Sequence, residues 1–413
     1  MKKGLILAAS LILLPVIAGA GCSRATGFDR ELEGIAAPYE FSIVDWEIGT
    51  IPHEIRQAAP RLPESPESEA RSVIEYFDNG QRIRALEREI QAASRNDPQA
   101  DLTALQDELN ALSERNRSLE AKVERVLEKQ IRDTLAAQGI FNPTDRYPSP
   151  KITIPPLNFK LERPPHLLVV SPRDNIQSLR EIILKQDMTT AEMIAVEAEA
   201  DQLGVSSLVV ELGGLGAVYP SFVSNKGSLR FTLNAATEEW LHQYLLFRPL
   251  GFLYVLDITG VSPDYEIATI NETVVGIVSK EIGGFVYEQY YAPYETSPTT
   301  QTSPEETDSG FDFNREMRET RRQVDAYLAA GEIETAEAFM EQKRQYLAEN
   351  GYYIRKLNQA YFAFHGTYGD SPTSISPIGD ELDSLREQSQ SLKDFLDKAS
   401  ALTSRDDIRK LLE

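Results

Sequence analysis

Apolar residues recur every three or four positions along much of the chain, and this spacing predicts helices. In residues 68–139 an Asn at 116 falls on the apolar seam, as in coiled coils that use a polar residue to fix their register. Asn96-Asp97-Pro98 interrupts the pattern, which leaves two alternatives: a helical hairpin within one chain, or a coiled-coil homodimer. The seam itself consists of Leu102, Leu105, Leu109, Leu112, Leu119, Val123 and Val126.

Short apolar runs at 167–170 and 207–212 lack this period and predict buried strands. The alternating segment 151–154 predicts an edge strand. Helices are expected at about 176–183 and 190–203, where apolar residues return to helical spacing. A few strands among many helices predict a predominantly helical α+β fold with a small sheet.

Two further helices are expected at 228–247 and 270–282. Arg248-Pro249-Leu250-Gly251 ends the first and Gly283-Gly284 ends the second, because Pro and Gly disfavour helix continuation. Both helices carry acidic residues, and the first also carries a histidine. They are the stretch from which a function can be argued.

The remaining segments frame this core. Residues 22–67, rich in Pro and charge, predict a tether that is extended or partly docked. Residues 292–312 have almost no apolar side chains and predict a flexible linker. From 313 to 413 the pattern is helical, with an antiparallel pair broken near Gly331 and two short amphipathic helices at 382–412. The predicted organisation is therefore a helical spacer (68–139), an α+β core (140–291) and a C-terminal helical region that completes the core.

The overall charge narrows the range of partners. A net charge of −22 and an isoelectric point near 4.7 exclude nucleic acid and anionic lipid as the main partner. The chain has four histidines, so a metal site must also use carboxylates. The composition therefore predicts that any metal site combines a histidine with Asp or Glu residues.

The N-terminus has the organisation of an export signal. A basic start, an apolar run at 5–17 and small residues at 18–21 precede the only cysteine, Cys22. This resembles the bacterial lipoprotein signal, although Gly19 stands where Leu is usual. The resemblance implies that residues 1–21 are removed and that Cys22 is lipidated. The protein would then be anchored to a membrane of the cell envelope and face outside the cytoplasm. An ordinary signal peptide or an uncleaved anchor is the alternative, and both also export the chain.

Glu238 and His242 lie four residues apart and share one helix face, with Glu239 beside them. In His-Glu-x-x-His, the outer residues of the same spacing bind zinc and the Glu activates water. The second helix contributes Ile270-Asn271-Glu272, thirty residues after His242. Over residues 228–284 the chain resembles the gluzincin (thermolysin-like) metallopeptidases. The resemblance implies that His242 and Glu272 are metal ligands, that Glu239 is the general base, and that Glu238 replaces the first ligand His.

A second departure from the gluzincin pattern is Gly276, which stands where an Asp commonly supports a ligand His. A Glu at 238 would repel such an Asp, so the two differences form either one coordinated change or paired decay. A Glu-His-Glu set can bind zinc, and its oxygen-rich composition also favours manganese or iron. Without a metal, the same side chains would form a solvated helix face with one His at the core edge.

Tyr361 and His365 also lie four residues apart, in a segment dense in aromatic residues. A peptidase of this class needs a hydrogen-bond donor for the oxyanion of its tetrahedral intermediate, and these two side chains are candidates. The alternative is an aromatic packing stripe.

The sequence thus favours a membrane-anchored, extracytoplasmic metal-dependent peptidase that acts on a peptide or protein. The alternative is a catalytically degenerate peptidase fold that serves as a binding or scaffold lipoprotein of the envelope. A carboxylate-bridged di-metal protein would need a second Glu-x-x-His besides Glu239 and His242, and the sequence contains none.

Overall fold

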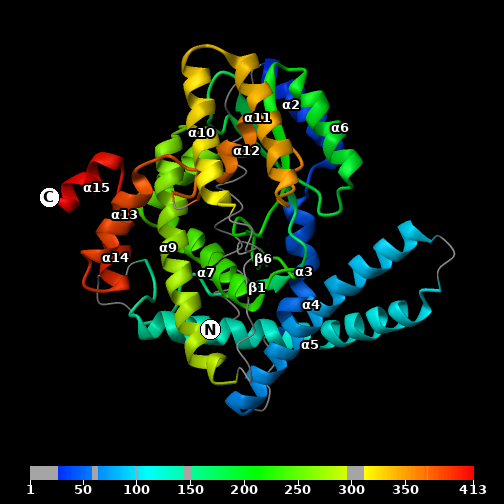
Figure 1. Cartoon of the computed structure of the whole chain (residues 1–413). Helices are drawn as coiled ribbons and strands as arrows, with labels where there is room; N and C mark the ends of the chain where they lie inside the picture. The colour runs from blue at the N-terminus through cyan, green and yellow to red at the C-terminus, as the bar shows by residue number, and fades with distance from the viewer. Residues whose placement is uncertain (1–26, 58–63, 98–100, 144–150, 295–310, 370) are drawn as a thin grey trace.

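The computed structural model describes residues 27–57, 64–97, 101–143, 151–294, 311–369 and 371–413 (Figure 1). The fold is predominantly helical with two small three-stranded sheets, so the predicted α+β class is confirmed. The signal segment 1–21, Cys22 and most of the linker 292–312 lie outside the described residues. Within the described part of the chain, no helix is both long and apolar enough to span a membrane.

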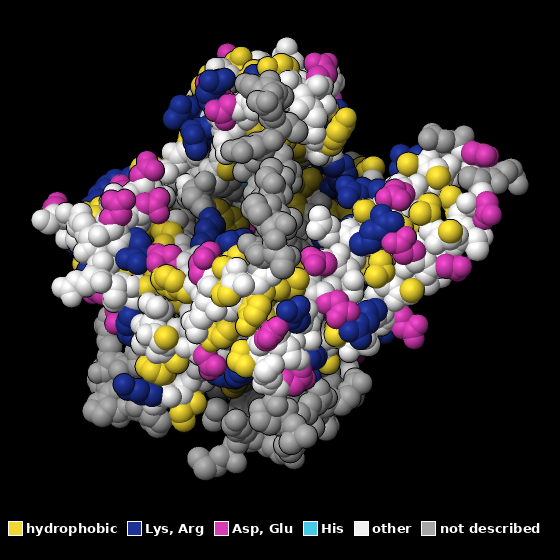
Figure 2. All heavy atoms as spheres, turned by 60° about the horizontal axis from the view of Figure 1, so that its bottom comes forward, with side chains coloured by type: hydrophobic (Ala, Val, Ile, Leu, Met, Phe, Trp, Pro, Cys, Tyr) yellow, Lys and Arg dark blue, Asp and Glu magenta, His cyan; other side chains and the backbone are white. Residues whose placement is uncertain are grey.

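Two long helices, α4 (Pro66–Asn96) and α5 (Thr103–Ala137), pair as an antiparallel hairpin that projects from the body (Figure 1). Glu75 and Arg115 form a two-bonded ion pair across it, at 2.6 and 2.8 Å. Asn116 donates to the Tyr76 carbonyl at 3.0 Å, so the polar residue of the seam fixes the pairing of these helices. Acidic and basic side chains alternate along the hairpin rather than forming a patch of one sign (Figure 2).

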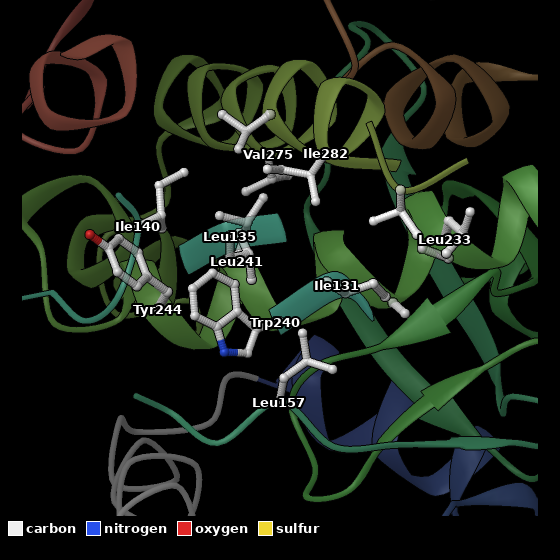
Figure 3. Packing of buried hydrophobic residues seen from close by; sticks show 14 of the residues in the cluster. Ile131, Leu135, Ile140, Leu157, Leu233, Trp240, Leu241, Tyr244, Val275 and Ile282 are labelled. Atoms are coloured by element: carbon white, nitrogen blue, oxygen red, sulfur yellow. The ribbon is translucent and has the colours of Figure 1, made fainter. Parts of the chain in front are cut away.

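The base of this hairpin belongs to the main core. Leu119 to Ile140 of the α5 segment pack against α7 (Leu229–Leu245) and α9 (Tyr265–Tyr290) (Figure 3). Trp240 and Leu241 are buried there, and Trp240 donates its indole N–H to the Pro155 carbonyl at 2.8 Å. The boundary expected near residue 139 therefore does not separate a spacer from the core, because α5 is part of both.

The first sheet has the antiparallel order β3-β2-β4, formed by Arg180–Leu184, His166–Pro172 and Val205–Glu211. Its side chains alternate between two layers, as strand geometry requires. Leu168, Val170 and Val209 pack with α2 (Gly27–Ala36) and α6 (Thr190–Asp201). Leu167, Val169, Leu208 and Val210 pack on the other face with α12 (Gln359–His365). This accounts for the uninterrupted apolar runs, since both faces are covered.

The second sheet has the order β1-β6-β5, with β1 at Phe159–Leu161, β6 at Ser221–Val223 and β5 at Gly214–Leu215. The prediction of an edge strand at 151–154 was wrong, because this segment pairs with no strand in the structure. The helix expected at 176–183 was also wrong, because β3 occupies Arg180–Leu184. Its β-branched pair Ile182 and Ile183 suits a strand, and β2 supplies a full ladder of partners.

The tether expected at 22–67 contains two docked helices, α2 and α3 (Ile43–Gln57), joined through the short turn η2 (Ala37–Tyr39). Leu32 of α2 is buried against the first sheet. Trp46 of α3 stacks on Phe222 of β6 with ring centroids 3.7 Å apart. Residues 27–57 are therefore part of the folded body and not an extended tether.

After α9 and the turn η3 (Ala292–Tyr294), α10 (Phe313–Ala329) and α11 (Ile333–Glu349) form the expected antiparallel pair. Gly331 between them has φ +76°, a conformation that favours glycine. The C-terminal segment forms three short helices rather than two: α13 (Ile378–Glu387), α14 (Leu392–Ala399) and α15 (Arg405–Leu412). All three contribute to the core around α9.

Candidate metal centre

Helices α7 and α9 cross closely and bring the sequence-predicted ligands together. Gly283 makes this approach possible, because a Cβ at this position would lie 2.0 Å from Asn234 Oδ1 of α7. The helix expected to end at Gly283-Gly284 instead continues to Tyr290. Here glycine provides close helix packing rather than a helix end, and the crossing places Glu272 opposite Glu238 and His242.

Glu238, His242 and Glu272 each offer one ligand atom, and these atoms all lie within 4.8 Å of one another. His242 Nε2 is 3.8 Å from Glu272 Oε2. Ligand atoms of a tetrahedral zinc site are separated by roughly 3.3 Å, so a small side-chain adjustment would bring this pair to coordination distance. The three side chains could therefore hold a metal ion.

Two tyrosines hold the carboxylates in place. The Tyr254 hydroxyl of α8 (Pro249–Ile258) donates to Glu272 Oε1 at 2.5 Å, and the Tyr368 hydroxyl donates to Glu238 Oε1 at 3.0 Å. The Tyr254 ring also stacks on the His242 imidazole, with centroids 5.5 Å apart. Each carboxylate thus uses one oxygen for a tyrosine and keeps the other for an ion, an arrangement that orients metal ligands.

Burial and mutual repulsion act on the carboxylates of this cluster. Burial, followed by the charge of Glu272, raises the pKa of Glu238 to about 7, against smaller opposing effects of His242, Tyr368 and Lys280. Burial also holds the pKa of both tyrosines well above the ordinary value, so they remain hydrogen-bond donors. A divalent cation bound between Glu238 and Glu272 would offset the repulsion between their two carboxylates.

Glu239 lies beside the cluster, under a glycine-rich turn. A Cβ at Gly214 would be 2.2 Å from Glu239 Oε1, and a Cβ at Gly216 would be 2.7 Å from the Glu239 carbonyl oxygen. Glycine permits this approach, which explains the glycines at 214 and 216. Burial raises the pKa of Glu239 well above its ordinary value, the charges of Glu238 and Glu272 add to this, and the Gly216 N–H opposes it by donating to the carboxylate.

These residues line one cavity of about 510 Å³ between α7, α8, α9 and the edge strand β5. Its polar lining includes Glu181, Gln243 and Thr259 besides the Glu-His-Glu set, Glu239 and the two tyrosines. The rest of the wall is mostly apolar and includes Leu212, Leu215, Phe231, Leu246, Val255 and Ile258. A cavity of this size with few convergent polar groups has the character of a small-molecule or peptide side-chain site.

Tyr361 and His365 are not brought into this cavity. Their rings pack against each other on α12, with centroids 4.3 Å apart, and Tyr361 also packs with the apolar clusters on either side. Burial lowers the pKa of His365 to about 4 and raises that of Tyr361 to about 12. Phe364 and Tyr368 line the cavity in their place, so the aromatic segment contributes to the site through other residues.

Gly276 lies on the Tyr368 side of α9. A Cβ at this position would be 4.0 Å from the Tyr368 ring, the residue whose hydroxyl donates to Glu238. A neutral hydroxyl therefore supports Glu238 from the region where the gluzincin pattern has an Asp. An Asp here would repel Glu238, whereas the tyrosine hydroxyl does not.

Two polar groups near the site lack partners among the described residues. Asn271, adjacent to Glu272, is fully buried and neither its Oδ1 nor its Nδ2 makes a hydrogen bond there. His242 Nδ1 is also buried without a partner. Metal-ligating histidines usually donate this second ring nitrogen to an acceptor, so the donor set fits a metal but the support of His242 is incomplete.

Comparison of the chain with family models, curated proteins and solved structures gives no match. The gluzincin resemblance therefore rests on the residues of α7 and α9 alone. The Glu-His-Glu cluster does not by itself identify that family.

Proposed function

We propose that the protein is a metal-dependent peptidase, with Glu238, His242 and Glu272 as ligands and Glu239 as the general base. The observation that carries the proposal is the convergence of three ligand atoms within 4.8 Å in a cavity that the Glu239 carboxylate also lines. Zinc is the first candidate ion, and the two carboxylate ligands also allow manganese or iron.

Bound in this cavity, the ion would supply Lewis acidity toward a substrate carbonyl and lower the pKa of a water molecule. Glu239 would take the proton from that water and pass it to the leaving amine. Its raised pKa is in keeping with this role, because a carboxylate of higher pKa is a stronger acceptor for the proton of water. Tyr254 and Tyr368 would keep the ligand carboxylates oriented during these steps.

The proposed substrate is a peptide or protein met outside the cytoplasm. The lipoprotein-like sequence around Cys22 supports export and attachment to the membrane through an N-terminal lipid. The apolar wall of the cavity favours a bulky apolar side chain next to the reacting carbonyl.

A metal-free binding lipoprotein is the second candidate. The unpartnered His242 Nδ1 favours it, because such a histidine is poorly supported as a ligand. In that case the cavity would bind an apolar segment of a partner without cleaving it.

Metal analysis of the full-length protein, purified from membranes in detergent, separates the two candidates. Mass spectrometry is expected to find about one equivalent of metal per chain, lost in His242→Ala and in Glu272→Ala. His365→Ala is the matched control, because this histidine is also largely buried but lies outside the cavity, and it should retain the metal. No stoichiometric metal after incubation with zinc, manganese or iron would exclude the enzyme.

Glu239→Gln tests the catalytic step once a peptide substrate is in hand. The variant should retain the metal and lose roughly 10²–10⁴-fold in turnover, the usual contribution of a general base. Unchanged turnover would remove Glu239 from the mechanism.

A further inference from the structure

Helix α8 is strongly apolar and only partly covered. Among the ten residues of Pro249–Ile258, Leu250 and Gly251 are buried. Phe252 is 56% exposed, Ile258 is 44% exposed, and Val261 in the following turn is 55% exposed. Val255 and Leu256 follow Phe252 by three and four residues, so they lie on its side of the helix, and both are partly exposed. Exposed apolar side chains of this kind are typical of contact with a protein partner or with lipid.

The end of α8 lies beside the start of the described chain. A Cβ at Gly260 would be 3.2 Å from an Arg180 guanidinium nitrogen, and Arg180 Nε donates to Asp29 of α2 at 2.9 Å. Arg180 thus bridges the turn after α8 and the first helical turn of α2. Cys22 precedes Gly27 by five residues, a segment that spans at most roughly 18 Å when fully extended. A lipid on Cys22 would hold this side of the molecule close to the membrane.

We propose that the exposed face of α8 and Val261 rests on the bilayer that holds the Cys22 lipid. The inference depends on the proposed lipidation of Cys22. Lipid is favoured over a protein partner because the short connection from the anchor places a bilayer within reach of this face. Because the chain has a net charge of −22, anionic lipid headgroups would repel it. Its contact with the bilayer would therefore depend on the insertion of apolar side chains.

This placement also defines how substrate reaches the cavity. Val255, Ile258 and Thr259 of the α8 segment line the cavity, and Ile258 is both exposed and part of the wall. The rim of the cavity at Ile258 would therefore face the lipid surface. The substrate class that this arrangement favours is a peptide segment at the membrane surface, either beside a membrane span or bearing its own lipid.

Depth-dependent quenching tests the placement. The chain has one cysteine, Cys22, which cannot be labelled when it carries lipid, so introduced cysteines take a thiol-reactive dye selectively. Full-length protein carrying Phe252→Cys or Val261→Cys would be labelled and reconstituted in vesicles of zwitterionic lipid with brominated acyl chains. We expect loss of emission at both positions relative to vesicles without bromine. Leu411→Cys on α15 is the control, since Leu411 is 42% exposed, and it should show no loss.

The outcomes separate failure of the contact from failure of the anchor. Intact mass is measured in parallel to show whether Cys22 is lipidated. With lipid on Cys22, equal emission with and without bromine at 252 and 261 would overturn the proposed contact and leave the anchor and the metal site unaffected. A free thiol at Cys22 would overturn the anchor, and the inference with it, while metal analysis would still report on the peptidase. Metal content of each labelled variant confirms that it has folded.

Discussion

Buried carboxylates in this protein have two kinds of hydrogen-bond partner, charged and neutral. Glu197 on α6 is 3% exposed, and Arg355 donates to both of its oxygens at 2.6 and 2.8 Å. The Val209 N–H of β4 adds a third hydrogen bond at 2.6 Å. This carboxylate is thus neutralised within the fold, and it ties α6, β4 and the segment before α12 together.

The metal-centre carboxylates have different partners. Glu272 is 7% exposed, and its hydrogen bond comes from the neutral Tyr254 hydroxyl. Glu238 likewise accepts a hydrogen bond from the neutral Tyr368 hydroxyl. Neutral donors orient a carboxylate without satisfying its charge, so the charge remains available to an ion or a proton. The difference separates a carboxylate that is neutralised within the fold from carboxylates that could hold a metal ion.

Substitutions in the two groups of carboxylates should change the stability of the protein most strongly. Arg355→Ala should lower the free energy of unfolding by about 3 kcal/mol, because it removes both guanidinium hydrogen bonds from the buried Glu197 and leaves it only the more distant Lys356, at 3.9 Å. Glu238→Gln should have the opposite sign in metal-free protein at pH 8, since it removes a charge that its surroundings disfavour. Urea unfolding followed by circular dichroism measures both. If Glu238→Gln destabilises the metal-free protein as Arg355→Ala does, the two groups of carboxylates are not different.

The tyrosine donors should have the next largest effect, on metal affinity. Tyr254→Phe and Tyr368→Phe each remove one hydroxyl and retain the ring, so the ligands lose orientation but not packing. We expect each variant to weaken metal binding about 10-fold, at the lower end of the usual cost of losing such a partner. Titration calorimetry measures the affinity, with Tyr361→Phe as the control outside the cavity. Equal affinity in all three variants would show that the hydroxyls do not support the ligands.

The smallest expected effect is the pH dependence of stability. Because the pKa of Glu238 rises from its ordinary 4.5 to about 7 in the fold, the folded metal-free protein binds more protons than the unfolded chain between these values. Its contribution to stability is therefore full below pH 4.5 and is lost as the pH rises through 7. Metal binding requires the deprotonated carboxylate, so the metal-induced rise in melting temperature should be larger at pH 8 than at pH 5. Scanning calorimetry at both pH values, with and without zinc, checks this; an equal shift would contradict it.

The sequence was sufficient for those features that depend on local pattern. The positions of α6 and α7 followed from helical periodicity, and those of the strands β2 and β4 from short apolar runs without that period, because each element packs its apolar residues in the expected way. The segment that became β3 was mistaken for a helix, since its apolar spacing fits both structures and only pairing with β2 decides between them. The helices of residues 27–57 were missed, because their docking on the two sheets is a tertiary effect.

The site was predictable only where its residues share a helix. Glu238 and His242 are adjacent on α7, and Glu272 was inferred from a family pattern. Tyr254 and Tyr368 reach these ligands from α8 and from the loop after α12, and no local signal distinguishes them from other tyrosines. The glycines of 213–216 were the available clue to a close backbone approach, but the sequence did not show that Gly214 and Gly216 face Glu239.

Crystals grown with zinc, with diffraction data collected on either side of the zinc absorption edge, test most directly whether Glu238, His242 and Glu272 bind one divalent ion. We expect one anomalous peak at about 2.0–2.2 Å from His242 Nε2 and from an oxygen of each carboxylate. An ordered cavity without a peak, or a peak bound only by other residues, would contradict it.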